Sequence, residues 1–435
     1  MTLMKFARAF SSSSKRVAFI DGARIPFNGA GTVYKDLISY DLGRLATKGI
    51  VDRNALDGKE VDYLYWGNVV QEVRTNNIAR EITLGSGLPN TIPSHTIGQA
   101  CISSSQAVCS GAEKILAGKA DVILAGGSET FSDVPIRFSR PIRQRLLNFP
   151  KAAKKGPLGI LKLLKGLKLK DLAPEPPAIK NFSTGEIMGH SSDRLASRFG
   201  VTRAEQDAFA VKSHHCAAKA HAAGLYDQEI IPVNGSREEN LIRGDTSVEK
   251  IGKLKPAFVK PHGTHTAGNS SPLTDGASAC LIMSEDKAKA LGYKPRSFLK
   301  AWAFVSVDPF EEMLLGPAYG IAKLLRENNL TIADVGVWEI HEAFAGQVLA
   351  NLAALDSDAF CKEMLGQGKK YGRPDDSVLN SWGGSVAIGH PFGATGVRIL
   401  TTATNRMHAE NSKYAIMAAC ADGGQAHAAL IERAD

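Results

Sequence analysis

Several side chains stand where this sequence could do covalent chemistry, and the first is a thiol. Cys101 lies where the loop 97–100 meets a predicted helix over 101–118. A thiol at a helix N-terminus faces the positive end of the helix dipole and unpaired N–H groups, so we predict a lowered pKa and a nucleophilic thiolate. A lone cysteine is more often a small buried hydrophobic residue. Its interpretation as a nucleophile therefore depends on a base nearby.

The base is predicted in the second half of the chain. His390 lies in the glycine-rich loop 389–396, just before a second predicted helix, in the position that Cys101 occupies in the first half. Helix starts that face each other would bring this imidazole to the thiol. His341 follows the predicted strand 335–340, at the kind of strand end where sites on parallel sheets gather.

A second thiol follows near the C-terminus. Cys420 ends another predicted strand, and Asp422 with the two glycines after it leaves backbone N–H groups accessible to an oxyanion. A carboxylate beside such a site would be unfavourable, so we predict that the side chain of Asp422 faces outward. We expect Cys101, His390 and Cys420 to converge on one pocket.

The elements that must position these residues occur twice. Each half contains a predicted helix, an apolar strand and two glycines: 101–118, 122–125 and 126–127 in the first, 396–407, 414–419 and 423–424 in the second. The repetition predicts duplicated α/β halves with buried, largely parallel sheets. Between the halves lies a segment of different amino-acid composition, with a charged helix predicted over 202–224. Such an insertion usually covers or shapes a site.

Composition limits the class of protein. Hydrophobic residues make up 44% of the 435, and charged residues 22%, which is a globular composition. Six cysteines without a C-x-x-C pair exclude a disulfide scaffold or zinc ribbon. No stretch reaches the ~18–20 apolar residues of a membrane span. The N-terminal segment 1–15 is serine-rich, basic and free of acids, as in transit peptides.

The positive charge is concentrated in one segment. The chain has 52 Lys and Arg against 44 Asp and Glu, giving +8. Eleven of the basic residues lie between Asp133 and Asp171, with no acid among them, so the remainder sums to 8 − 11 = −3. Within this segment, Ile160 to Lys170 has the spacing of an amphipathic helix with a lysine face. An anionic membrane, an acidic subunit or RNA could bind it, and we rank RNA last because interleaved aromatic residues are missing.

Together these segments resemble the signature blocks of the thiolase superfamily. The blocks are a Cys at a helix start, His341-Glu342-Ala343-Phe344-Ala345, the loop 389–396, and a late Cys before Gly-Gly. His341 stands where Asn is commoner, and with the basic insertion it makes the thiolase subunits of mitochondrial fatty-acid oxidation complexes the best match. The resemblance implies duplicated α/β halves in an αβαβα layered sandwich with an inserted loop domain. The predicted parts are a transit segment 1–15, an N-terminal half 16–135 plus 272–295, an insertion 136–271 with the basic segment 137–170, and a C-terminal half 296–435.

The resemblance also implies roles in thiolytic cleavage of a 3-ketoacyl-CoA. Cys101 attacks the keto carbon, His390 takes its proton, and Cys420 protonates the acetyl-CoA enolate and then activates the incoming CoA. His390 and His341 hold the thioester oxygen, while the backbone N–H groups of Cys101 and Asp422 hold the tetrahedral oxyanion. Ser271 corresponds to a serine near bound CoA.

Further expectations concern cofactors and partners. CoA serves as co-substrate, and no metal or redox cofactor is needed; His214-His215 and His262/His265 look like solvated pairs. The resemblance implies a homodimer assembled with a hydratase/dehydrogenase subunit, on the matrix side of the mitochondrial inner membrane, without nucleic acid. Ile187 replaces the histidine of short-chain relatives, which favours medium or long acyl chains.

Two other functions fit part of the pattern. A condensing β-ketoacyl synthase also uses a Cys-His-His set, but has no need of Cys420. A non-catalytic scaffold of the same fold could use the basic segment alone, although the intact blocks argue against it.

Overall fold

The computed structural model describes residues 15–178 and 180–435, so most of the predicted transit segment lies outside the described residues. The strands form one mixed sheet in the order β4-β3-β5-β6-β1-β7-β10-β9-β8, and β2 pairs with β6. Their bounds are β1 Val17–Arg24, β2 Asn28–Gly29, β3 Tyr63–Gly67, β4 Ser94–Ile97, β5 Val122–Glu129, β6 Thr274–Ser284, β7 Ser297–Ser306, β8 Val337–Ile340, β9 Tyr414–Ala421 and β10 Gln425–Arg433.

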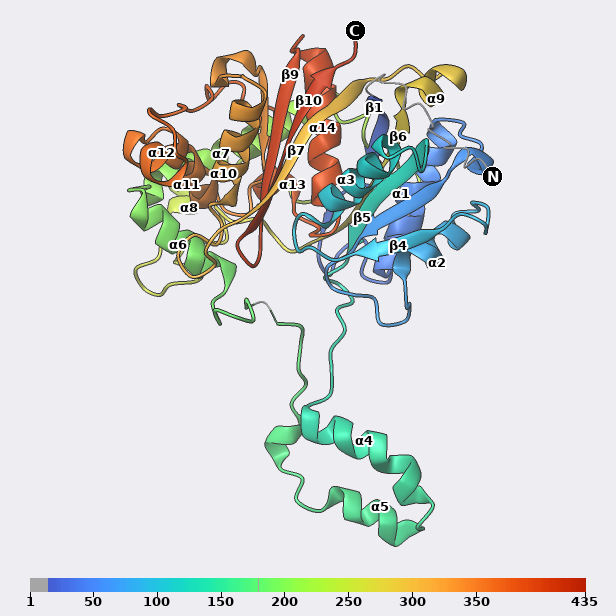
Figure 1. Cartoon of the computed structure of the whole chain (residues 1–435). Coiled ribbons are helices and arrows are strands. Elements are labelled where there is room, and N and C mark those ends of the chain that lie inside the picture. The colour runs from blue at the N-terminus through green and yellow to red at the C-terminus, as the bar shows by residue number, and fades with distance from the viewer. Residues whose placement is uncertain (1–14, 179) are drawn as a thin grey trace, which may run out of the picture.

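Helices cover both faces of this sheet and also lie between its halves (Figure 1). The outer helices are α1 Ser39–Arg53 and α2 Ile78–Gly85 on the first half, and α10 Gly316–Glu327, α11 Ala345–Leu355 and α12 Asp358–Met364 on the second. The middle helices are α3 Ser103–Leu116 and α14 Thr395–Ala409, which contact each other and strands of the sheet. Short helices are α9 Glu285–Ala290 and α13 Ser385–Ile388. The predicted layered sandwich of two α/β halves is therefore confirmed.

The prediction of largely parallel sheets is wrong. Pairs of β3 with β4 and β5, and of β8 with β9, are parallel, whereas β1, β6, β7 and β10 pair antiparallel with their neighbours. The helix–strand units supply the parallel strands, as expected. A tight turn joins the antiparallel strands β9 and β10, and the antiparallel pair of β1 with β7 joins the two halves.

The two Gly-Gly pairs have different structural roles in the two halves. Gly126 and Gly127 do not end their strand as predicted, because β5 continues to Glu129. A Cβ on Gly127 would collide with the carbonyl oxygen of Gly393 in the second-half loop. Gly423 and Gly424 lie in the turn after β9, with φ of 84° and 72°. Gly127 allows strand β5 to touch the glycine-rich loop of the second half, and the second pair allows a tight turn.

The insertion contains two parts. Near the sheet lie α6 Met188–Arg198, α7 Arg203–Ala222 and α8 Val248–Gly252. Helix α7 matches the predicted 202–224, since Thr202 caps it by accepting from the Glu205 N–H while the Glu205 carboxylate accepts from Thr202.

The other part is a basic hairpin, residues 136–172, which projects from the body on two extended segments (Figure 1). It consists of α4 Arg140–Ala153, α5 Pro157–Leu164 and a 3₁₀ turn Leu169–Leu172, and α4 contacts α5. The predicted helix from Ile160 to Lys170 is too long, because α5 ends at Leu164 and Gly166 has a φ of 75°. Arg145 caps the last turn by donating to the Leu163 and Lys165 carbonyls at 2.6 and 3.2 Å.

Across residues 15–178 and 180–435, no helix has both the length and the apolar character that crossing a bilayer requires.

Candidate active site

The turn before α3 presents Cys101. Ser103 locks this turn, because its hydroxyl donates to the Ala100 carbonyl at 2.7 Å and accepts from the Gln99 N–H at 2.8 Å. Ala100 has a φ of 45°, a left-handed conformation that costs energy in a residue with a side chain. Helix α3 begins at Ser103, so Cys101 lies just before the helix rather than inside it.

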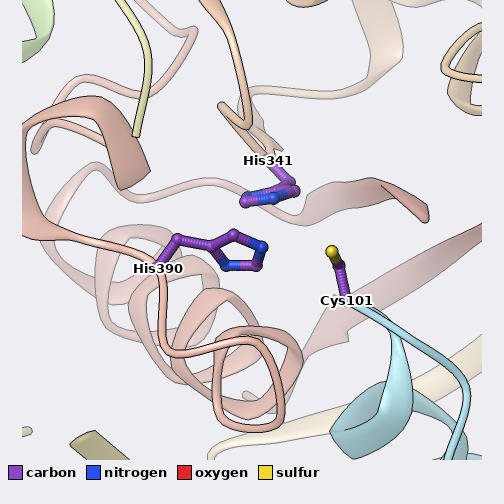
Figure 2. Close-up of side chains that lie close together, drawn as sticks. All are labelled: Cys101, His341 and His390. Atoms are coloured by element: carbon purple, nitrogen blue, oxygen red, sulfur yellow. The ribbon is translucent and has the colours of Figure 1, made fainter. Parts of the chain in front are cut away.

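Three of the predicted residues meet in one place. The Cys101 sulfur and one ring nitrogen each of His341 and His390 lie within 4.8 Å of one another, and both imidazoles face the thiol (Figure 2). The ring centroids of His341 and His390 are 4.1 Å apart, and both rings are buried. A thiol with two imidazoles is a nucleophile with bases, and it also has the donor types of a Zn²⁺ site.

The hydrogen bonds of His390 fix which ring nitrogen is the base. Thr395 donates its hydroxyl hydrogen to the Pro391 carbonyl at 3.0 Å, which leaves only lone pairs for His390 Nδ1 at 2.6 Å. His390 Nδ1 must therefore carry the hydrogen, and Nε2 the lone pair. Within the described residues Nε2 has no partner. Burial lowers the pKa of His390 to about 3, with the Arg398 charge as a second cause, so the ring is neutral and able to accept a proton.

The prediction of a lowered pKa for Cys101 is wrong. Burial of the sulfur raises its pKa to about 12, and the charges of Asp422 and Glu129 add to the rise. The N–H groups of Cys101 and Asp422 oppose this shift but do not overcome it. The thiol is therefore protonated at neutral pH, and it needs His390 to remove its proton.

Cys420 is the next-to-last residue of β9 and is buried. Burial raises its pKa well above the usual value, and the neighbouring Cys101 sulfur adds to the effect. Asp422 lies in the next turn, where its N–H points toward the Cys101 sulfur. Its carboxylate is half-buried and accepts from the Asn181 amide at 2.7 Å, rather than facing outward as predicted. The Asn181 amide stabilises the charge of the Asp422 carboxylate, for which the sequence alone showed no partner.

Ser271 lies beside the two histidine loops. Its N–H donates to the Ala343 carbonyl at 3.0 Å, and Leu273 in the same segment bridges to His390. Thr274 accepts from the His390 N–H at 3.0 Å. This segment therefore connects the His341 loop to the His390 loop, while the role of Ser271 toward CoA stays a prediction.

Sequence reasoning missed Glu129, which holds the glycine-rich loop. Its buried carboxylate accepts from the N–H groups of Val69, Val70 and Gly393 at 3.0–3.1 Å. Burial raises its pKa to about 8. An acid at the end of an apolar strand was the available signal, because such residues are rarely buried without partners.

The two histidine pairs are not simply solvated. His215 and His262 are exposed, as predicted, but His214 and His265 are buried. His265 pairs with Asp193 at 2.8 Å and with Ser192 at 3.0 Å. These contacts hold α6 against the segment that leads to Ser271.

Comparison with known families agrees with this arrangement. Residues 17–286 match the thiolase N-terminal domain, and residues 293–433 match the thiolase C-terminal domain. The chain belongs to the thiolase family. The resemblance of its signature blocks to this superfamily is thereby confirmed.

Several thiolases match over almost the whole chain. The mitochondrial trifunctional enzyme subunit beta of Homo sapiens is 47% identical over 96% of this chain and 88% of its own length. A probable 3-ketoacyl-CoA thiolase of Caenorhabditis elegans is 49% identical over 98% and 97%. The acetyl-CoA acetyltransferase of Bacillus anthracis superposes with a TM-score of 0.81 at 29% identity, covering 97% of this thiolase and 99% of the other. Acat5 thiolase from Ascaris suum in complex with coenzyme A gives 0.81 at 28%, covering 97% and 100%.

Proposed function

We propose that this thiolase cleaves 3-ketoacyl-CoA with CoA, giving acetyl-CoA and a shortened acyl-CoA in fatty-acid β-oxidation. The observation that carries the proposal is the convergence of Cys101 with His390 and His341 in a family whose similar members are named 3-ketoacyl-CoA thiolases. The enzyme is an acyltransferase, with CoA as co-substrate and without a metal or redox cofactor.

The first half-reaction transfers the acyl group to sulfur. His390 Nε2 takes the thiol proton as the Cys101 sulfur bonds to the 3-keto carbon, and N–H donors hold the resulting oxyanion. When the carbonyl re-forms, the Cα–Cβ bond breaks, and its electron pair leaves on acetyl-CoA as an enolate. The Cys420 thiol gives this enolate its proton. Acetyl-CoA and an acyl thioester on Cys101 result.

The second half-reaction returns the sulfur. The Cys420 thiolate takes the proton of the incoming CoA thiol, and the CoA sulfur attacks the thioester carbon. The C–S bond to Cys101 breaks, and the leaving thiolate recovers its proton from His390. Each proton returns to its starting group, so the cycle consumes no external acid or base.

The decisive experiment is steady-state thiolysis with Cys101→Ala as the blank. Cys420→Ser should abolish thiolysis, because a hydroxyl is too weak an acid for the enolate and its alkoxide too costly to form. A condensing synthase would lose little with the same change and would decarboxylate malonyl thioesters. Thiolysis at the blank's level in the wild-type chain would favour a non-catalytic scaffold instead.

Acyl-chain preference is part of the proposal. Ile187 precedes α6, and Met188 and Phe258 pack partly buried against the apolar cluster that contains Phe344, next to His341. An apolar wall of this kind favours medium or long chains. A kcat/KM on acetoacetyl-CoA equal to or above that on 3-ketohexadecanoyl-CoA would contradict this preference.

We also infer a mitochondrial location, with peripheral contact between the basic hairpin and an anionic membrane. Exposed apolar side chains alternate with exposed lysines there, and Leu147, Leu158 and Leu169 are 79%, 74% and 85% exposed. Such a surface matches the anionic headgroups and acyl boundary of a bilayer. Vesicles containing cardiolipin should retain the wild-type protein and release a variant lacking 137–170. Equal retention of both would refute the contact.

The proposal also includes assembly with partner subunits. Because the human relative is named a trifunctional enzyme subunit beta, we expect a hydratase/dehydrogenase α-subunit. We also expect a homodimer, and β4 supports it, since its only sheet neighbour within the described residues is β3. Sedimentation of the purified chain tests the dimer, and co-purification with the α-subunit tests the complex.

A further inference from the structure

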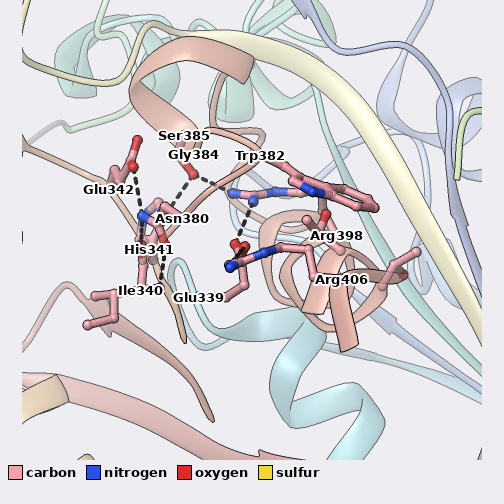
Figure 3. A network of polar contacts seen from close by, with 12 residues as sticks. Glu339, Ile340, His341, Glu342, Asn380, Trp382, Gly384, Ser385, Arg398 and Arg406 are labelled. Carbon is pink, nitrogen blue, oxygen red and sulfur yellow. Dashed lines mark hydrogen bonds and ion pairs between the residues drawn. The ribbon is translucent and has the colours of Figure 1, made fainter. Parts of the chain in front are cut away.

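His341 rests on a chain of buried polar groups that leads to an arginine on α14. His341 Nδ1 lies 3.0 Å from the Ser385 hydroxyl, and Arg398 Nη2 donates to the same hydroxyl at 2.7 Å (Figure 3). All three side chains are buried. The chain His341–Ser385–Arg398 therefore connects the site to α14.

The order of donors along this chain is determined by chemistry. A guanidinium can only donate, so Ser385 accepts from Arg398 and keeps its single hydrogen for another partner. Among the described residues His341 Nδ1 is the only group besides Arg398 bonded to this hydroxyl. If His341 Nδ1 accepts, the hydroxyl hydrogen is paired and the ring hydrogen lies on Nε2. That nitrogen has no partner within the described residues.

Arg398 can donate to Ser385 because a second arginine, Arg406, forms the close ion pair with Glu339. Arg406 Nη1 lies 2.7 Å from the Glu339 carboxylate, whereas the closest approach of Arg398 is 3.8 Å. Arg398 Nε and Nη1 have no hydrogen-bond partner among the described residues. The hydrogen bond to Ser385 is therefore the main polar contact of this buried charge.

The result is a pair of histidines in opposite states. His390 presents a lone pair at Nε2, as its contact with Thr395 requires, and the pairing of the Ser385 hydroxyl hydrogen with Nδ1 makes His341 present an N–H. We propose that Ser385, held by Arg398, is a positioning residue that fixes the His341 hydrogen on Nε2, so that His341 donates to the oxygen that becomes negative during the reaction. The catalytic part of this inference rests on the proposed thiolase function.

The tautomer itself can be measured on the resting full-length chain. NMR of protein labelled with ¹⁵N-histidine, with His341→Asn used for assignment, should show the hydrogen of His341 on Nε2. A hydrogen on Nδ1 would overturn the inference. This result does not depend on turnover, so a chain that shows the expected tautomer but cleaves no 3-ketoacyl-CoA would refute the proposed function alone.

Ser385→Ala tests the cause. We expect the ¹⁵N shifts of His341 to move toward a mixture of tautomers and kcat to fall about tenfold with KM unchanged, less than the ~10²–10³-fold that loss of a whole oxyanion donor costs. Ser297→Ala is the matched control, since it removes a buried hydroxyl that bonds to Thr404 at 3.0 Å instead of the His341 ring. The control should leave the His341 shifts in place. Unchanged shifts in both variants would overturn the role of Ser385.

A double variant separates positioning from general packing. If Ser385 acts through His341, Ser385→Ala should add no further loss of kcat to the His341→Asn variant. An equal loss in both backgrounds would show that the hydroxyl only supports the fold, and the inference would fail.

Discussion

The active site buries polar side chains, whereas the basic hairpin exposes apolar ones. In the site, both imidazoles are buried and each has one nitrogen fixed by a hydroxyl. In the basic hairpin, Leu147 and Leu169 are 79% and 85% exposed, and most of the lysines are exposed as well. The site therefore depends on the position of single atoms, whereas the hairpin depends on the kind of residue it displays.

After loss of either catalytic cysteine, the largest effect should come from His390. His390→Ala removes the lone pair that takes the thiol proton, and we expect kcat for thiolysis to fall ~10²–10⁴-fold. Thr395→Val keeps the ring but removes the acceptor of its Nδ1 hydrogen, so a smaller loss of about tenfold should follow. Stopped-flow or steady-state thiolysis gives both values. Equal losses would mean that the ring's orientation matters as much as the ring, and a loss below tenfold for His390→Ala would exclude it as the base.

The next effect tests how closely the two halves must touch. Gly127→Ala places a Cβ against the Gly393 carbonyl, so the glycine-rich loop must shift. Overpacking of this kind costs about 1–3 kcal/mol, and displacement of His390 should lower kcat about 100-fold. Gly368→Ala is a matched control, because a Cβ there meets no atom within 4 Å. Similar kcat values for both variants would show that the contact does not position the base.

The sequence allowed the site to be predicted better than its electrostatics. Cys101, His341 and His390 were predicted because signature blocks carry residue identities in order, and the repeated helix–strand units placed two of them opposite each other. The pKa of Cys101 was predicted in the wrong direction, because burial depends on every chain segment that packs around the sulfur. Helix dipole and spacing are local properties, but desolvation is not.

The fold was predictable to a similar degree. Helices α3, α7 and α14 lie within a few residues of their predicted bounds, since their apolar spacing and caps are local. The antiparallel joins through β1 and β7 were missed because strand direction follows from long-range pairing. Helix α4 was missed as well, and its interior Pro150 weakens the helical pattern.

The pH dependence of thiol reactivity sharpens the description of the site. With a thiol pKa near 12 and a His390 pKa near 3, the proton stays on sulfur until the substrate is attacked. Alkylation of resting Cys101 by iodoacetamide should therefore rise about tenfold per pH unit from neutral to mildly alkaline conditions, without a plateau. Asp422→Asn removes a charge that raises the thiol pKa, and should speed alkylation about threefold at each pH. Mass spectrometry of the Cys101 peptide measures both rates, and a plateau near neutral pH would show a pre-formed thiolate.

The smallest effect is expected for a leucine substitution in the hairpin, compared with the same substitution in the core. Leu147 on α4 is 79% exposed, whereas Leu352 on α11 is 1% exposed within the main apolar cluster. Leu352→Ala should lower the free energy of unfolding by about 2–5 kcal/mol, because it leaves a cavity. Leu147→Ala should change it by less than about 0.5 kcal/mol and leave kcat unaltered, because its side chain already meets solvent. Urea denaturation of the two variants makes the comparison. A large loss of unfolding free energy for Leu147→Ala would mean that the hairpin leucines pack on a second subunit rather than bind a membrane. Vesicles would then retain that variant as well as they retain the wild type.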